Sequence, residues 1–397
     1  MRIPLRPPRR VSAGLRLVTV AAAVSLGAGA LAGYAASSAA VSRQVSASVG
    51  PTIPLTTSSV TDTTTWATLA MGHLGDPLNT FWQLLALSGS RWQLATPPGV
   101  ASNGGLVAAP ASNSLLAGFG ASQKLQFSPV ARTDDQGSSW QAGVLPGSLS
   151  LVPDALAQGS GESLALLRTA GGKVVTSTGG LSTWTSVITA SALRRQSALA
   201  DCHLRSLTAV TLDVQGSTLV GASCAQGGRA GLFAPSSDGW MSVGPGIPGK
   251  SSGPTEVVRL DQTAAGTAAL VSAGSGATTR LYAMWATDGL GPWTVSTGLL
   301  LDGASLLSTG VTSTGGFVVS TRRGRAAPSA SVLGPTGSQW KSLPSLPSGT
   351  TSVTAGPAGS YEALVPVRST LSVYLLGSTG WARVQTLRVD IPYGSSG

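Results

Sequence analysis

Seven tryptophans recur along the chain, and each ends a turn rich in glycine, serine or threonine that follows a β-prone run. They are Trp92, Trp140, Trp184, Trp240, Trp293, Trp340 and Trp381. The successive steps between them are 48, 44, 56, 53, 47 and 41 residues. A repeat of this length is typical of a β-propeller, whose small antiparallel sheets bury their faces by packing radially around an axis. The spacing predicts an all-β ring and leaves the chemistry open.

The turn that ends at Trp140 is the most complete copy. From Thr133 it reads Thr-Asp-Asp-Gln-Gly-Ser-Ser-Trp, so Thr133, Asp135, Gly137, Ser139 and Trp140 match Ser/Thr-x-Asp-x-Gly-x-Ser/Thr-Trp at every position. This turn resembles the Asp-box, or BNR repeat, of sialidase-like propellers. Gly137 suits a tight turn with positive φ, and the side chains of Thr133 and Asp135 can bond backbone amides. We expect Trp140 to cover the hairpin with its ring.

The other copies keep only parts of this pattern. Ser237–Trp240 keep an Asp-Gly-Trp core, and Thr287–Trp293 keep the aspartate five residues before the tryptophan. The resemblance spans residues 63–397, which is about 48 residues for each tryptophan. It implies an all-β fold with a single seven-bladed β-propeller. We expect the last segment, Ala382–Tyr393, to pair with the first strands near Thr65 and to close the ring.

The N-terminus carries an export signal. Five arginines within the first 16 residues precede Leu17–Ala36, an uncharged apolar run of 20 residues. A basic start, an apolar stretch and small residues such as Ser37–Ala40 are typical of a cleaved signal peptide. About 20 apolar residues also span a bilayer, so an uncleaved signal anchor is the open alternative. Both place the body outside the cytoplasm, secreted or anchored to the outer face of the cytoplasmic membrane.

The chain therefore divides into three parts. Residues 1–40 are assigned to the signal peptide or signal anchor, residues 41–62 to a linker rich in serine, threonine and proline, and residues 63–397 to the propeller.

The two cysteines, Cys202 and Cys224, flank a strand-like segment. Outside the cytoplasm a disulfide between them is the expected state. A metal site formed with His203 is the alternative, but it lacks a fourth ligand and any familiar spacing. We expect no metal and no cofactor.

The net charge of +10 overstates the basicity of the folded body. Residues 1–40 hold five arginines and no acidic residue, so the remainder carries +5. Charged residues make up only 10% of the chain, and no basic cluster is interleaved with aromatic residues, which argues against nucleic-acid binding. We expect a monomer whose contact with a membrane is limited to the N-terminal segment.

Carboxylates for glycan hydrolysis are scarce. The chain has three glutamates, Glu162, Glu256 and Glu362. Tyr361 and Glu362 are adjacent, so on a strand their side chains point to opposite faces and make a poor catalytic pair. Glycoside hydrolysis needs two carboxyl groups across the scissile bond. The resemblance therefore implies the fold and the turn motif without catalytic residues.

One region combines polar groups, aromatic rings and rigid turns. Its candidate binding residues are His73, Asp76, Asn79, Trp82 and Asn103. The alternative is an ordinary pair of connections, because Asp-Pro and Asn-Gly dipeptides are common turn signals.

Together these features predict an exported, non-catalytic propeller that binds an unknown protein or glycan at the cell envelope through its loop faces. The alternative is a glycan-acting hydrolase of sialidase-like fold with an atypical active site. That alternative requires two or more carboxylates lining the central pocket.

Overall fold

A computed structural model of the chain describes residues 56–389, apart from 62–63, 74–79, 98–104, 112–113, 121–126, 147–152, 168–170, 197–200, 250–252, 336 and 357–358. The chain divides into two compact units, Met1–Ser46 and Ala47–Gly397, and every described element belongs to the second. The predicted signal peptide or anchor lies outside the described residues. Within the described part of the chain, no helix has the length and apolar character needed to cross a membrane.

The second unit is built from short antiparallel strands that pair with their neighbours in sequence. The strands of its first half are β1 (Thr56–Val60), β2 (Thr65–Gly72), β3 (Thr80–Ser88), β4 (Arg91–Leu94), β5 (Gly105–Ala111), β6 (Ser114–Gly120), β7 (Phe127–Thr133), β8 (Gln141–Pro146), β9 (Ala155–Gln158), β10 (Glu162–Leu167), β11 (Lys173–Thr178), β12 (Thr185–Thr189), β13 (Leu204–Leu212), β14 (Thr218–Cys224), β15 (Gly231–Ser236) and β16 (Gly239–Ser242). A short helix, α1 (Ala190–Arg194), follows β12.

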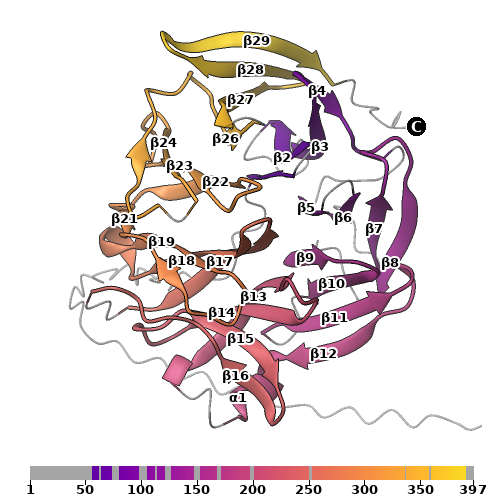
Figure 1. Ribbon diagram of the computed structural model, residues 1–397. Coiled ribbons are helices and arrows are strands. Elements are labelled where there is room, and N and C mark those ends of the chain that lie inside the picture. The colour runs from indigo at the N-terminus through magenta and orange to yellow at the C-terminus, as the bar shows by residue number, and fades with distance from the viewer. Residues whose placement is uncertain are drawn as a thin grey trace, which may run out of the picture. The chain divides into compact units, whose positions relative to one another are not determined.

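The second half continues in the same way. Its strands are β17 (Thr255–Thr263), β18 (Gly266–Ala273), β19 (Arg280–Ala286), β20 (Thr294–Val295), β21 (Leu299–Leu300), β22 (Ser305–Val311), β23 (Phe317–Arg322), β24 (Ser329–Leu333), β25 (Lys341–Ser342), β26 (Ser352–Ala355), β27 (Tyr361–Val367), β28 (Thr370–Gly377) and β29 (Gly380–Arg388). The strands form four-stranded meanders such as β5–β8, β9–β12 and β26–β29, which follow one another around a common centre (Figure 1).

The repeat tryptophans mark the outermost strand of each meander. Trp92, Trp240 and Trp381 lie within β4, β16 and β29. Trp140, Trp184, Trp293 and Trp340 immediately precede β8, β12, β20 and β25. The spacing of the tryptophans in the sequence therefore equals the distance along the chain from one outermost strand to the next.

The hydrophobic core consists of layers between successive sheets. Middle strands such as β6 and β18 are buried along nearly their whole length, because a neighbouring sheet covers each face. One layer joins β9–β12 to β13–β15, and the next joins β13–β15 to β17–β19. Strands β14 and β17 approach each other closely at Gly221. An added Cβ at Gly221 would lie 2.7 Å from Val257 Cγ1, so this position requires a residue without a side chain.

The ring closes by side-chain packing between the first and last meanders. Leu69, Leu85 and Trp92 pack there against Leu364 and Val373. The expected pairing of the last segment with the first strands is wrong for the described residues, since β29 pairs with β28. Within the described residues, the backbone link across this junction is the hydrogen bond from Gly72 N to Arg368 O, at 3.0 Å.

Strand β1 lies in the range assigned to the linker, yet it is an integral part of the ring. It pairs antiparallel with β2 and parallel with β22, in register from Thr56–Ser308 to Ser59–Val311. The serine and threonine run that resembled a linker is therefore a strand with partners on both edges.

Candidate functional site

A cavity of about 540 Å³ opens where the first strands of the meanders end. It is lined by the C-terminal ends of β1, β5, β9, β13, β17 and β22. Polar lining residues include Thr61, Arg132, Gln158, Asp261 and Gln262. A concave pocket with a few convergent polar groups is the first candidate for a small-molecule site.

The strand directions define two ends of the ring. Consecutive strands are antiparallel, so the turns after the first and third strands of each meander lie at the end that holds the cavity, which we call the pocket end. The turns after the second strands and the connections between meanders lie at the opposite end, which we call the far end. Strand β1 begins at the far end with Thr56 and reaches the pocket with Val60.

The most connected charged group near the centre is Arg259 on β17. Its Nε lies 2.6 Å from Asp261 Oδ2, and its Nη2 lies 3.1 Å from Asp261 Oδ1. The same guanidinium donates to Thr309 O at 2.8 Å and to Ser59 Oγ at 2.6 Å. The side chains of Arg259 and Asp261 are 10% and 18% exposed. Arg259 therefore joins β17, β22 and β1 and orients the Asp261 carboxylate at the pocket wall.

Asp261 is the one carboxylate that lines the pocket among the described residues. Glu162 accepts a hydrogen bond from Thr176 Oγ1 at 2.6 Å, and Glu362 accepts one from Trp92 Nε1 at 2.5 Å, both outside the pocket lining. Glu256 lies at the start of β17, and burial raises its pKa to about 7. The pair of pocket carboxylates that a glycoside hydrolase needs is therefore not found among the described residues.

The turn before Trp140 lies at the pocket end beside Arg132. The carboxylate of Asp135 accepts hydrogen bonds from Thr133 Oγ1, from Ser139 N and from Ser139 Oγ, at 2.8, 2.8 and 2.6 Å. The Ser139 and Thr133 bonds lower the pKa of Asp135 below its ordinary value. Gly137 has a φ of +92° and donates to Thr133 Oγ1. These contacts stay within the turn, so Asp135 stabilises the hairpin.

The structure describes two of the five residues of the candidate binding surface, His73 and Trp82. His73 is exposed after β2 at the far end, and its carbonyl accepts a hydrogen bond from Thr80 Oγ1 at 2.8 Å. Trp82 is only 6% exposed and packs in the core, so its assignment to a surface is wrong. Asp76, Asn79 and Asn103 lie outside the described residues.

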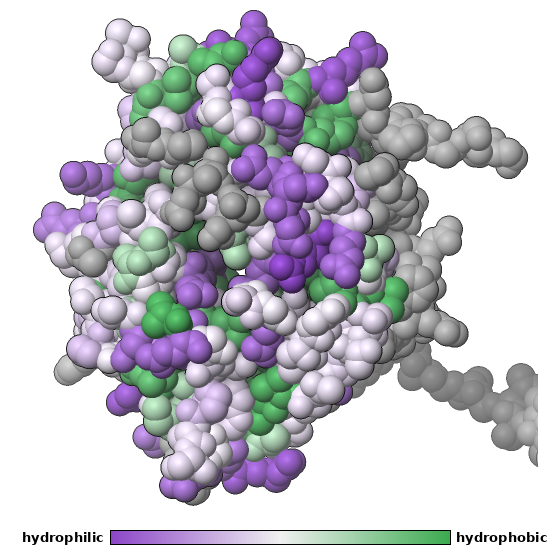
Figure 2. All heavy atoms as spheres, turned by 45° about the vertical axis from the view of Figure 1, so that its right-hand side comes forward, coloured by the Kyte–Doolittle hydropathy of each residue, from purple (hydrophilic) through white to green (hydrophobic). Residues whose placement is uncertain are grey.

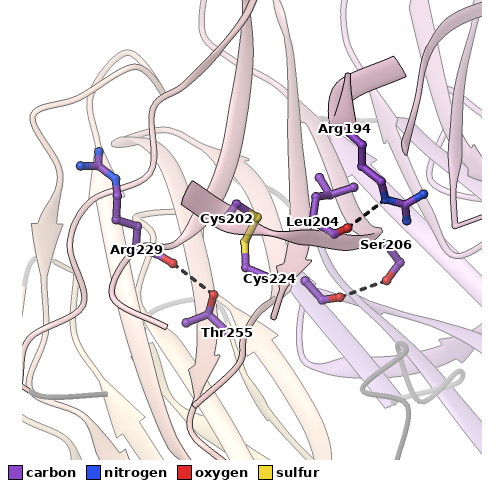
Figure 3. Close-up of a disulfide and its surroundings, with 8 residues drawn as sticks. Arg194, Cys202, Leu204, Ser206, Cys224, Arg229 and Thr255 are labelled. Carbon is purple, nitrogen blue, oxygen red and sulfur yellow. Dashed lines mark hydrogen bonds between the residues drawn. A yellow bond between two sulfur atoms is a disulfide. The ribbon is translucent and has the colours of Figure 1, made fainter. Parts of the chain in front are cut away.

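Cys202 and Cys224 form the expected disulfide, with their Cα atoms 4.9 Å apart (Figure 3). The bond ties the segment after α1 to the end of β14. Because both sulfur atoms are used, the alternative metal site with His203 is excluded. The disulfide is consistent with an extracytoplasmic location, where such bonds persist.

Sequence reasoning missed Arg132, Arg259 and Asp261. A signal was present, because Arg259 and Asp261 alternate on one strand of a chain with only 10% charged residues. Alternation places them on the same side of the strand. What the sequence did not indicate is that β17 is the innermost strand of its meander.

Comparison with known proteins shows the fold. No protein-family model and no curated protein matches the chain. Among solved structures, the chain is similar to a periplasmic gluconolactonase from Pseudomonas aeruginosa, with a TM-score of 0.51, 11% identity, and coverage of 81% of this chain and 95% of that one. It is also similar to a putative 6-phosphogluconolactonase from Bacteroides uniformis, with a TM-score of 0.50, 12% identity, and coverage of 83% and 97%.

A third similar structure is the β-propeller domain of the Trilobed protease from Pyrococcus furiosus, with a TM-score of 0.46, 8% identity, and coverage of 83% and 97%. The radial meanders identify the fold as a β-propeller, and the likenesses with TM-scores of 0.50 and 0.51 support the same overall fold. The expectation of a non-catalytic scaffold is corrected by the same comparison, because the two structures with TM-scores of 0.50 and 0.51 are both named as lactonases.

Proposed function

We propose that the protein is a hydrolase of small sugar-derived lactones, with its reaction site in the central pocket. The observation that carries this proposal is the Asp261 carboxylate, which Arg259 holds at the pocket wall through two hydrogen bonds. The fold shared with two lactonases supports the reaction class by analogy only, because one fold hosts many functions.

In this proposal Asp261 acts as a general base. Its carboxylate takes a proton from a water molecule while the water oxygen bonds to the lactone carbonyl carbon. Arg132, which also lines the pocket, donates hydrogen bonds toward the oxyanion that develops. The carbon–oxygen bond of the ring then breaks, and the departing oxygen recovers the proton from Asp261. The product is the open hydroxy acid.

The finer features of the fold belong to the same proposal. We propose seven blades of four strands, related to sialidase-like propellers, supported by seven repeat tryptophans at the starts of outer strands and by the Asp135 turn. We also propose export by the N-terminal segment, which the disulfide supports.

The test measures proton release from hexonic γ- and δ-lactones, with and without a phosphate group, above the uncatalysed rate. We expect Asp261→Asn to lower kcat/KM by about 100-fold or more, as expected for a general base. Asp261→Glu, which keeps a carboxylate, should retain part of the activity. Asp238→Asn is the matched control, because Asp238 is exposed in the β15–β16 turn at the same end of the ring.

Near-ultraviolet circular dichroism of each variant separates loss of fold from loss of chemistry. A wild-type protein that accelerates no lactone above the blank would overturn the proposal. Full activity in folded Asp261→Asn would remove Asp261 from it.

A further inference from the structure

Charged side chains are sorted between the two ends of the ring. At the pocket end, the hairpin turns carry acidic residues such as Asp134, Asp135, Asp238 and Asp288. The basic residues described on that side are fewer, namely Arg91, Arg132, Arg259, Lys341 and Arg383. Among the described residues the far end has the opposite balance, so their charges are unequally divided along the axis of the ring.

One basic group of the far end lies close in sequence to the two disulfide-bonded cysteines. It consists of Arg194 and Arg195 at the end of α1, Arg205 at the start of β13, and Arg229 in the β14–β15 turn. All four residues are exposed. Arg194 is fixed by a hydrogen bond of 2.9 Å from its Nε to Leu204 O, and Figure 3 shows Arg194 and Arg229 on either side of the disulfide.

A second group continues this charge around the ring. Arg323 and Arg325 lie in the β23–β24 turn, Arg280 begins β19, and Arg368 lies in the β27–β28 turn. These four are also exposed. Arg323 is paired with Asp302. Beside the buried Glu256, the acidic residues described at the far end are Asp154, Asp201 and Asp302.

The partner of such a surface is recognised by charge rather than by apolar contact. Exposed apolar side chains such as Leu94, Met241 and Val384 lie on different outer strands. Figure 2 shows hydrophobic residues in small separate groups among polar ones on the face in view. A face with dispersed arginines suits a flat, multivalent, anionic surface.

We propose that the far end binds the anionic headgroups of a lipid bilayer. Strand β1 begins at this end, so the described part of the chain enters the ring on its basic side. Basic residues near an anionic bilayer each contribute about 1 kcal/mol, and the attraction decays over about 8 Å at physiological salt. The pocket, at the opposite end, stays open to solvent. This inference does not depend on the proposed hydrolase activity.

The test uses the unit Ala47–Gly397, which is compact by itself and holds every described strand. A single cooperative thermal transition verifies its fold. Sedimentation with phosphatidylglycerol vesicles should show binding that falls as salt rises, and phosphatidylcholine vesicles should show none. Arg195→Gln, Arg205→Gln and Arg325→Gln together should weaken binding about tenfold or more. The matched control removes the same charge from the pocket end through Arg91→Gln, Lys341→Gln and Arg383→Gln.

Three results would overturn the proposal. The first is equal binding to neutral and anionic vesicles. The second is an equal loss of binding in the far-end and pocket-end variants. The third is full displacement from vesicles by soluble polyphosphate at an equal phosphate concentration, which would identify an anionic polymer as the partner.

Discussion

Three of the repeat tryptophans, Trp184, Trp340 and Trp381, donate their indole N–H groups to backbone carbonyls of the preceding meander. Trp340 donates to Thr297 O at 3.1 Å, and Trp381 donates to Pro344 O at 3.3 Å. At the junction of the first and last meanders, Trp92 instead donates to the Glu362 carboxylate at 2.5 Å. Burial raises the pKa of Glu362, and the indole bond opposes that shift. At this junction the indole N–H thus has a side-chain carboxyl group as its acceptor, where Trp340 and Trp381 have backbone carbonyls.

We expect Glu362→Ala to lower the free energy of unfolding by about 1–3 kcal/mol, because the buried Trp92 N–H loses its acceptor. Glu362→Gln keeps an acceptor oxygen and should cost less. Urea unfolding at neutral pH measures both, with Asp238→Ala as a surface control. If Glu362→Ala were no worse than that control, the hydrogen bond would have no role in closing the ring.

The buried carboxyl group of Glu256 leads to a separate prediction about how the stability of the protein depends on pH. Its side chain is buried, and burial raises its pKa from 4.5 to about 7. The unfolded chain therefore loses this proton at lower pH than the folded protein does, and stability falls as pH rises from 4.5 to 7. A rise in pKa from 4.5 to about 7 corresponds to about 3 kcal/mol.

Glu256→Gln should therefore raise the free energy of unfolding by about 3 kcal/mol at pH 8 and leave it unchanged at pH 4. Chemical unfolding across that range measures the difference between the two proteins. A difference that stays constant with pH would show that Glu256 is ionised at the same pH in the folded and unfolded chains.

Among the elements, the hairpin between β7 and β8 depends on side chains within its own turn. Asp135 accepts three hydrogen bonds in the turn, whereas Asp134 pairs with Arg132 at 2.9 Å and is 62% exposed. We expect Asp135→Ala to lower the melting temperature more than Asp134→Ala does. Hydrogen exchange should show the loss at the Ser139 amide. Equal melting temperatures for the two variants would contradict this assignment.

The sequence predicted the hairpins that contain the repeat tryptophans better than it predicted the innermost strands. Tryptophan and turn residues have strong local signatures, so the hairpins at the rim were evident from Trp140 and its neighbours. Strand β1 was missed because its serine and threonine side chains resemble those of a linker, while its stability comes from pairing with β22, more than 200 residues away. The pocket residue Asp261 was missed for the same reason, since it reaches the centre of the ring only through contacts between segments far apart in the sequence.

For the whole molecule, β1 decides where the folded ring starts. Its contacts include Thr57 N to Thr68 Oγ1 at 3.0 Å and Arg259 Nη2 to Ser59 Oγ at 2.6 Å. A chain that begins at Thr63, the predicted start of the propeller, lacks these contacts. We expect it to melt roughly 10 °C below a chain that begins at Ala47, taking about 2–4 °C per kcal/mol of lost stability. Equal melting temperatures would place β1 outside the cooperative unit.

The parallel pairing of β1 also determines how the protein bears mechanical load. A pull on the N-terminal segment acts along β1, and the hydrogen bonds of β1 to β2 and β22 run across that direction. The pull therefore loads all of these hydrogen bonds together in shear, and they must break simultaneously rather than one after another. The tension enters at the centre of the ring and reaches Arg259 through Ser59. A load on β1 is therefore passed on to Arg259 and Asp261 at the pocket wall.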